Sequence, residues 1–449
     1  MTEPVGFRRE LGLVDAIVVV SGAVIGVGIF ANPSNVARIV GDPTLMITAW
    51  AAGGLLALLG GFAYAELASR LPHVGGQYVY LARAYHPIVG FLYGIALLFI
   101  INGGGLAAVA TIFASYVDSS FIRLGPLGIR IVAAAALLVL TAINVVGIRT
   151  GKRVNNALMA LKLAGICALL GMAFFGAGTS ATRFDAALWH TADTGWSRLL
   201  FTALVPIMFS YAGWQTCGFL AGEIRDPARN LARANILGVA LVVTLYVGLN
   251  VAYLRVLTAS EIAASPAVAY EMARTVAGER GGRLVATLIV VSSLGLLSVI
   301  VQAAPRLYYA MARDGFFPRR AAVLHPRFHT PSFMLWFQAG VSIALLATNT
   351  YDELLSYVVF TEWLFFGLAV AGLFALRRRD PKPAGLVAMP GHPVTTLLFV
   401  LAAAGIVVNT FFTYTTQSLV GSAILLAGAL SYIFIAVRRR RATASSRGH

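Results

Sequence analysis

The segment Gly22-Ala23-Val24-Ile25-Gly26-Val27-Gly28 places three glycines in the middle of a long apolar stretch, residues 12–40. About 20 mostly apolar residues are enough to cross a bilayer as a helix. Each glycine lowers helix propensity by about 1 kcal/mol relative to alanine. The pattern therefore predicts a membrane-spanning helix that is interrupted near its midpoint. Close packing of neighbouring helices through small residues is the alternative explanation for the glycines.

A second apolar stretch, residues 198–222, carries a similar interruption. Pro206 removes one helix hydrogen bond, and Phe209-Ser210-Tyr211-Ala212-Gly213-Trp214 follows with a glycine. The two interruptions lie about 185 residues apart, each in the first span of a five-helix group. Paired interrupted helices in matching positions indicate a transporter built from inverted repeats. The two halves share no obvious residue identity, so the repeat rests on hydropathy alone.

The composition of the whole chain is typical of an integral membrane protein. Hydrophobic residues make up 59% of the 449 residues and charged residues only 12%, against about 25% charged in soluble domains. Hydropathy predicts twelve spans in one all-α membrane domain. The predicted spans are 12–40, 44–68, 88–117, 127–147, 154–177, 198–222, 233–257, 284–311, 332–349, 354–376, 393–414 and 417–437. They group into two five-helix repeats (12–177 and 198–376), two further helices (393–437) and a cytoplasmic tail (438–449).

The positive charge follows the membrane topology. The net charge is +16, from 34 Lys and Arg against 18 Asp and Glu. About 24 of the 34 fall on the side assigned to the cytoplasm, among them the clusters Arg377–Arg379 and Arg438–Arg441. This asymmetry is what the positive-inside rule predicts, and it argues against nucleic acid as a partner. We expect a multi-pass protein of the cell (inner) membrane with both termini in the cytoplasm.

The interrupted backbone suggests a ligand. Unpaired peptide groups inside a membrane must face protein or a wet cavity. The first amides of the restarted helix suit a carboxylate, and the carbonyls that end the preceding half-helix suit an ammonium group. The amides assigned to the carboxylate of an amino acid are those of Gly26, Val27 and Gly28. The carbonyls assigned to its amine are those near Val24, Ile25, Phe209, Ser210 and Ala212.

Lys162 is the basic residue placed within a span, about two turns into residues 154–177. The chain has three lysines against 31 arginines, and a buried lysine can lose its proton whereas arginine cannot. An ionisable residue at this depth indicates function. Lys162 is either a fixed cation that replaces a bound sodium ion and braces the first interruption, or a group that couples a proton to transport. Snorkelling to the cytoplasmic surface is the structural alternative.

Several acidic residues complete the set of candidates. Glu362 is the carboxylate placed well inside a span, where it lines the substrate path, titrates, lies near the outer interface or serves a structural hydrogen bond. Glu66, Glu223 and Asp226 lie near cytoplasmic ends, beside Arg70, Arg225 and Arg229. They form either ion pairs of a cytoplasmic gate or a solvated face. The segment 69–87 is expected to be an interfacial or re-entrant helix, with Tyr78, Tyr80 and Tyr85 at the level of the lipid headgroups, or an amphipathic loop.

Signatures of other chemistry are missing from the sequence. Gly147 to Lys152 ends in Gly-Lys, but it has the wrong spacing for a phosphate-binding loop and no following Ser or Thr. Cys167 and Cys217 both fall in apolar spans and are expected to be small core residues. We therefore expect no catalytic residues, no metal, no cofactor and no disulfide framework. Transport would then draw on ion or substrate gradients.

Five motifs together resemble the amino acid–polyamine–organocation superfamily. They are Gly26-Val27-Gly28-Ile29-Phe30, Gly75-Gly76-Gln77-Tyr78-Val79-Tyr80-Leu81, Phe209–Trp214 with Gly222–Leu231, Pro305–Gly315, and Trp363–Leu368. The last is similar to the L-type amino acid transporter branch. The resemblance covers nearly the whole chain. It implies a LeuT-like fold, with two inverted five-helix repeats plus two helices and with spans one and six interrupted.

The resemblance also implies a function and residue roles. It implies sodium-independent amino acid transport, by exchange or with protons. Lys162 would stand where relatives bind sodium, and Phe209 would match the family's aromatic gate. Val27 departs from the usual serine, so a hydroxyl that helps to hold the carboxylate is missing. Leu296 and Ile300 replace small polar residues, which suggests a more apolar or smaller pocket.

Two further departures bear on substrate and partner. Glu362 stands where some L-type members have asparagine. No cysteine lies in the outer loop near residues 118–127, so no disulfide-linked heavy subunit is expected. A non-transporting amino acid sensor that uses the same pocket is the competing hypothesis. The lack of a sizeable soluble output domain argues against it, and a membrane enzyme lacks a plausible set of residues.

Overall fold

The computed structural model describes residues 9–146, 148–176, 195–265, 267–380 and 387–445. Within these ranges the chain is helical, without a β-sheet. The helices of the first half are α1 (Leu13–Val24), α2 (Gly28–Val40), α3 (Pro43–Arg70), α4 (Gln77–Ala84), α5 (Pro87–Ala96), the π-helix η1 (Leu97–Ile101), α6 (Asn102–Ser120), α7 (Gly125–Val145) and α8 (Ile148–Phe175).

The remaining helices follow in the same order along the chain. They are α9 (Trp196–Tyr211), α10 (Thr216–Phe219), η3 (Ala221–Glu223), α11 (Pro227–Val256), α12 (Ala259–Ala264), α13 (Val268–Arg313), η4 (Arg319–Ala322), α14 (Ser332–Thr348), α15 (Tyr351–Arg379), α16 (Val394–Thr413) and α17 (Thr415–Ser445). The elements therefore keep the order and approximate positions that hydropathy predicts.

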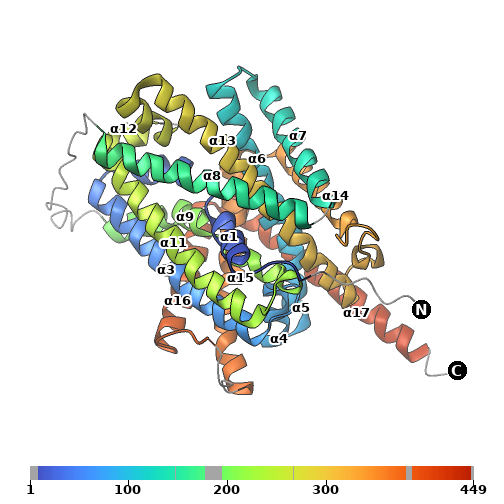
Figure 1. The fold of residues 1–449 in the computed structure, drawn as a ribbon. Helices are drawn as coiled ribbons and strands as arrows, with labels where there is room; N and C mark the ends of the chain where they lie inside the picture. Colours follow the sequence, from blue (N-terminus) through green and yellow to red (C-terminus); the bar gives the residue numbers. More distant parts are fainter. Residues whose placement is uncertain (1–8, 147, 177–194, 266, 381–386, 446–449) are drawn as a thin grey trace.

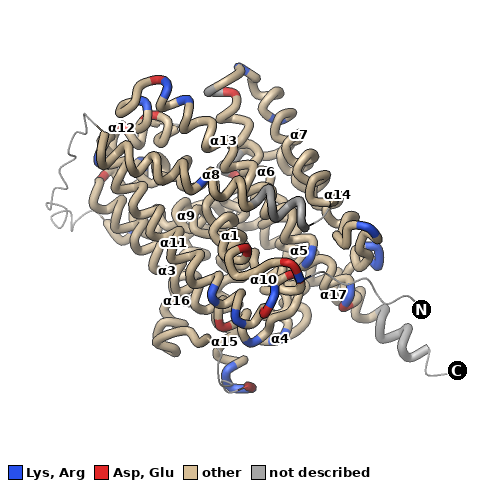
Figure 2. The backbone as a smooth tube through the Cα atoms, viewed as in Figure 1, with Lys and Arg blue, Asp and Glu red and all other residues tan. Residues whose placement is uncertain are grey.

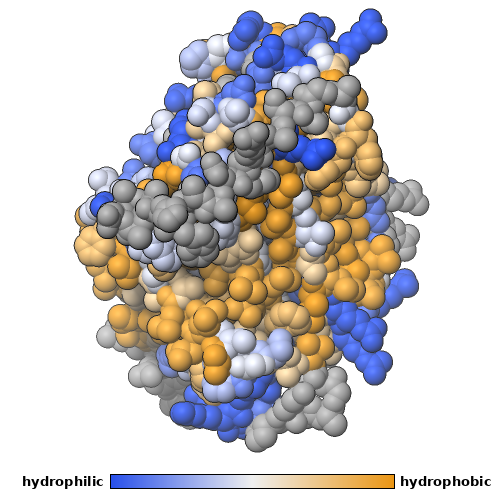
Figure 3. Space-filling model, turned by 90° about the vertical axis from the view of Figure 1, so that its left-hand side faces the viewer, coloured by the Kyte–Doolittle hydropathy of each residue, from blue (hydrophilic) through white to orange (hydrophobic). Residues whose placement is uncertain are grey.

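The surface is that of a membrane protein. Ten helical segments of the described chain are long and apolar enough to cross a bilayer. Figure 3 shows hydrophobic side chains across the middle of one face and hydrophilic ones towards both ends. Charged residues likewise gather towards the ends of the helices (Figure 2). The multi-pass, all-helical prediction is thus confirmed. The number twelve stays a prediction, because α9 ends in a break and α14 has only 17 residues.

Some sequence predictions were wrong in detail. Tyr78 and Tyr80 of α4 are each only 2% exposed, so they pack inside the protein instead of facing lipid headgroups. The Tyr78 hydroxyl donates to Asp314 at 2.6 Å, which ties α4 to the end of α13. Cys217 is buried, as expected, but Cys167 is exposed on α8. The last apolar span, Thr415–Val437, agrees with the predicted 417–437, although helix α17 itself continues to Ser445.

The two interrupted spans lie at the centre of the molecule. Helix α1 lies near the middle of the view in Figure 1 and packs against α8, α10, α11 and α13. The contacts are crossed: α2 packs against α9, and α1 packs against α10 and α11. Each half of the first interrupted span therefore meets the opposite half of the second, as two antiparallel broken helices would. The two breaks are brought to the same depth of the bundle.

A buried carboxylate anchors one end of this bundle. Glu66 on α3 is completely buried. It accepts hydrogen bonds from Arg70 Nε at 2.8 Å, from Arg377 Nε at 2.9 Å and Nη2 at 2.5 Å, and from the Met389 amide at 2.8 Å. These bonds join α3, the end of α15 and the segment before α16. The solvated-face interpretation of Glu66 is therefore wrong.

Removing this carboxylate should destabilise the fold. Breaking a buried ion pair by deleting one partner costs about 3–5 kcal/mol, so Glu66→Ala should lower the melting temperature in detergent by several degrees. Glu279→Ala is the control, because the Glu279 side chain is 62% exposed and lies 4.0 Å from Arg274. Thermal unfolding of both variants checks this, and equal shifts would contradict the anchoring role of Glu66.

Candidate functional site

The first break is a short extended segment between α1 and α2. Helix α1 ends at Val24, Ile25 has an extended backbone (φ −69°, ψ 93°), and α2 begins at Gly28. Among the described residues, the amides of Val27, Gly28 and Ile29 find no backbone or side-chain acceptor. A helix start of this kind carries a partial positive charge and attracts an anion.

The second break lies directly opposite the first. Helix α9 ends at Tyr211, Ala212 is extended (φ −66°, ψ 157°), and Gly213 has a positive φ of 124°. Glycine adopts such a backbone without the steric cost that a side chain brings. A Cβ atom at Gly213 would also lie 2.5 Å from the carbonyl oxygen of Ala23. The two breaks are therefore in backbone contact.

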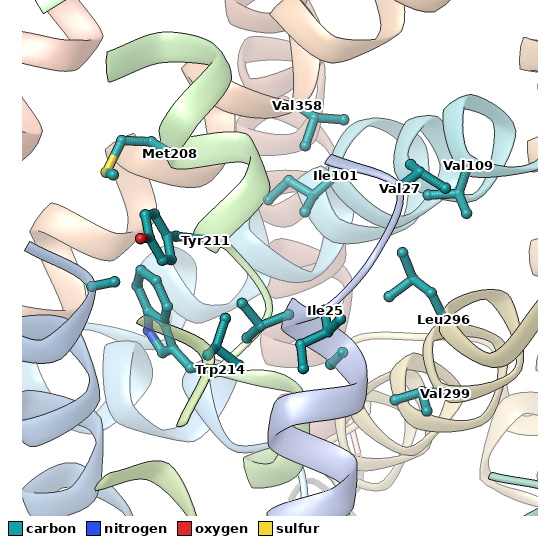
Figure 4. Packing of buried hydrophobic residues seen from close by; sticks show 14 of the residues in the cluster. Ile25, Val27, Ile101, Val109, Met208, Tyr211, Trp214, Leu296, Val299 and Val358 are labelled. Carbon is teal, nitrogen blue, oxygen red and sulfur yellow. The ribbon is translucent and has the colours of Figure 1, made fainter. Parts of the chain in front are cut away.

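Glycine also allows the start of α2 to approach α9. A Cβ atom at Gly28 would lie 2.8 Å from Cα of Ser210, closer than packed atoms come. At Gly26 the obstacle would be the flexible side chain of Leu296. Figure 4 shows Leu296 of α13 beside the unwound segment that joins Ile25 to Val27. A side chain at position 28 would therefore meet the backbone of α9, which cannot easily move. A side chain at position 26 would meet only the side chain of Leu296.

Two side chains hold the open backbone of the first break in place. Lys162 on α8 is only 3% exposed, and its Nζ donates to the carbonyl of Gly22 at 3.4 Å and to that of Ile25. Lys162 therefore does not snorkel. The hydroxyl of Tyr246 on α11 donates to the Val24 carbonyl at 2.8 Å and accepts from the Gly26 amide at 3.4 Å.

Asn32 joins the two interrupted spans on the other side of the breaks. Its Nδ2 donates to the carbonyl of Pro206 at 2.9 Å and to Ser210 Oγ at 2.8 Å. Asn32 is fully buried, so both bonds are shielded from solvent. The link fixes α2 to the last turns of α9, just before the second break.

The two breaks enclose a cavity of about 80 Å³. Its walls come from the breaks, η1 and α6, α13 and α15. The lining residues used below are Val24, Gly26, Val27, Gly28, Asn102, Phe209, Ser210, Ala212, Gln215, Thr216, Leu296, Ile300, Val358 and Glu362. All the residues predicted to bind substrate are therefore brought together here except Ile25, which does not line the cavity. Its carbonyl is taken by Lys162 on the far side of the break.

Glu362 is the acidic group of the cavity. It lies on α15, is 4% exposed, and accepts from Gln215 Nε2 at 2.7 Å. Of the roles that the sequence left open for Glu362, its burial in the cavity wall fits the substrate path, and its bond to Gln215 fits a structural hydrogen bond. No cluster of three or more His, Cys, Asp or Glu residues occurs in the described ranges.

A buried ion pair links the segment after α10 to α13. Glu223, after α10, accepts from Arg306 Nε of α13 at 2.8 Å, and the two side chains are 3% and 1% exposed. The Glu223 carbonyl accepts from the amides of Glu10 and Leu11 at 3.0 Å. The segment before α1 is thereby joined to the segment after α10. Glu223 pairs with Arg306 and not with the neighbouring Arg225, so its solvated-face interpretation is also wrong, whereas Asp226 is exposed.

The sequence analysis missed three residues of this site as candidates: Asn32, Gln215 and Tyr246. Each is an uncharged polar residue within a helix or beside a break. The depth of Asn32 within its predicted span was the available signal, because buried amides need partners. Tyr246 resembles any interfacial tyrosine in the sequence, and its role depends on α11 packing against α1.

Comparison with known proteins decides the family. The amino acid permease family matches residues 11–437. This chain belongs to the amino acid permease family, within the amino acid–polyamine–organocation superfamily. A serine/threonine exchanger, SteT of Bacillus subtilis (strain 168), is 28% identical over 446 residues, covering 98% of this chain and all of that protein.

Other permease relatives come from mammals. The human b(0,+)-type amino acid transporter 1 is 31% identical, over 82% of this chain and 76% of its own length. The rabbit (Oryctolagus cuniculus) large neutral amino acids transporter small subunit 2 is 30% identical, over 88% and 75% respectively. These relatives are amino acid transporters or exchangers, and they support amino acid transport across a membrane for this permease.

The geometry at Gly28 yields a test of the site. Gly28→Ala should reduce amino acid uptake at least tenfold, since the added methyl meets the Ser210 backbone and overpacking of this kind costs about 1–3 kcal/mol. Gly171→Ala is the control, because nothing lies within 4 Å of its Cβ position. Uptake by proteoliposomes measures both, and normal uptake by the Gly28 variant would show that the close approach is dispensable.

Proposed function

We propose that this permease is a sodium-independent secondary transporter that carries amino acids across the cell membrane by alternating access, through exchange or together with protons. The observation that carries the proposal is the pair of touching breaks around one cavity. Free amides at the start of α2 and carbonyls of the second break present opposite partial charges within this small volume. Such an arrangement suits both ends of a zwitterion.

The bound amino acid would be oriented by backbone dipoles. Its carboxylate would accept from the amides of Val27 and Gly28. Its amine would donate to carbonyls of the second break, near Phe209, Ser210 and Ala212. The carbonyls of Val24 and Ile25 are less suitable, because Tyr246 and Lys162 already donate to them. Phe209 lines the cavity and is placed to close over the ligand.

Lys162 would replace a coupling ion. Its amine sits against two carbonyls at the end of α1, which is the kind of ligand that a sodium ion would otherwise use. A fixed cation at this point would stabilise the C-terminal end of the half-helix without an ion from solution. This is the physical basis for proposing sodium independence.

The proposed transport cycle uses the whole architecture. The crossed contacts of α1, α2, α9 and α10 support two inverted five-helix repeats, plus two further helices, in a twelve-span topology with cytoplasmic termini. Opening to the cytoplasm would require the Glu223–Arg306 pair to separate. The transporter would work without a disulfide-linked heavy subunit.

Counterflow tests the function directly. Proteoliposomes preloaded with a mixture of unlabelled amino acids should accumulate at least one external radiolabelled amino acid, with equal rates in sodium and in choline buffers. Empty liposomes provide the background. Ligand-induced thermal stabilisation without flux would support the sensor hypothesis instead, and strict dependence on sodium would contradict the role assigned to Lys162.

Lys162→Met should reduce transport at least tenfold in sodium-free buffer. The substitution keeps most of the side-chain volume but leaves the Ile25 carbonyl without its donor, and an unpaired buried carbonyl costs about 1–3 kcal/mol. Leu161→Met is the matched control, because Leu161 is the preceding residue and is 43% exposed. Uptake normalised to folded protein measures the effect. Near-normal uptake by Lys162→Met would refute the proposed bracing.

A further inference from the structure

The cavity contains two acceptor atoms that the protein leaves without a donor. Glu362 receives one hydrogen bond, from Gln215 Nε2, and its second carboxylate oxygen has no donor among the described residues. Gln215 is 6% exposed, and its Oε1 is buried without a partner. Among the buried side-chain atoms of the described residues that lack a hydrogen-bond partner, Gln215 Oε1 is the one that lies in the cavity lining, and such an atom calls for an explanation.

No other side chain of the described lining donates to Glu362 or Gln215, and the hydroxyl of Thr216, which also lines the cavity, makes no hydrogen bond to either of them. Asn102 Nδ2 donates to Gln338 at 2.8 Å, and Ser210 Oγ donates to the Pro206 carbonyl at 2.9 Å. No Lys, Arg or His belongs to the described lining. Lys162 lies on the opposite side of the α1 break, where its amine is bound to carbonyls. The Glu362–Gln215 pair is therefore an acceptor-rich spot in a wall whose other polar side chains are Asn102, Ser210 and Thr216.

The pair is placed to contact a substrate side chain. Gln215 follows the second break by two residues, and Glu362 enters the same cavity from α15. The backbone groups of the breaks suit the carboxylate and amine that all amino acids share. Leu296, Ile300 and Val358 offer only apolar contacts. The pair is consequently the part of the lining best able to distinguish one side chain from another.

We propose that Glu362 and Gln215 select amino acids whose side chain ends in a hydrogen-bond donor, either a hydroxyl group or a cationic amine. This inference rests on the proposed transport function. A donor-tipped side chain completes the hydrogen bonds of both acceptors, whereas an apolar side chain of the same shape leaves them buried and unpaired. Sites built in this way reject isosteres that lack the polar group far more strongly than apolar pockets discriminate by size.

The experiment uses a counterflow assay in which unlabelled amino acids compete with the radiolabelled substrate. The competitors are compared in pairs of the same shape. Threonine is paired with valine, and ornithine with norleucine, so that shape is held constant while the donor changes. Wild-type transporter should prefer the donor-bearing member of at least one pair tenfold or more. Glu362→Leu should abolish that preference while still exchanging apolar amino acids. Val358→Ala is the matched control, since it alters the same wall but should keep the preference.

A second variant keeps the test decisive if Glu362→Leu folds poorly. Gln215→Leu removes the other acceptor and should reduce the same preference at least threefold. An unchanged donor preference in either folded variant, or no preference in wild type, would overturn the proposal. If the wild-type protein exchanges amino acids equally well with and without a side-chain donor, the proposed selectivity is refuted but the transport function is not. If it exchanges no amino acid, the proposed function fails and this inference fails with it.

Discussion

Peptide groups cannot remain unpaired inside a hydrocarbon layer, and this constraint governs the centre of the permease. Two spans give up helical hydrogen bonds at the same depth, so other groups must satisfy the exposed backbone. Lys162 and Tyr246 cover the carbonyls at the end of α1. Asn32 covers the Pro206 carbonyl next to the second break. Bonds from other helices thus stabilise what the local sequence weakens.

At the first break, the carbonyls and the amides have different surroundings, and this difference allows a polar cavity to exist. On one side of the first break, protein donors satisfy the carbonyls. On the other side, the amides of Val27 and Gly28 are left facing the cavity. Gly28 and Gly213 let the two backbones come into contact, so the polar ends of the half-helices converge. The residues around the two breaks therefore determine both how stable the breaks are and how well the cavity suits a zwitterion.

Much of this arrangement could be predicted because it leaves a local mark in the sequence. Glycines and a proline within apolar stretches predicted both breaks, and the depth of Lys162 predicted its burial. Partners that are distant in sequence leave no such mark. Glu223 pairs with Arg306 on α13 and not with the adjacent Arg225, and Glu66 gains Arg377 and Met389 from the far end of the chain. Tyr78 and Tyr80 looked interfacial because their burial depends on tertiary packing.

A cryo-electron microscopy map of the permease, with a transported amino acid bound in sodium-free buffer, tests the role of the two breaks most directly. The ligand carboxylate should lie within hydrogen-bonding distance of the Val27 and Gly28 amides. Its amine should face the second break, with Lys162 still on the Ile25 carbonyl. Density for the ligand outside this cavity, or a continuous helix through residues 24–28, would contradict the account.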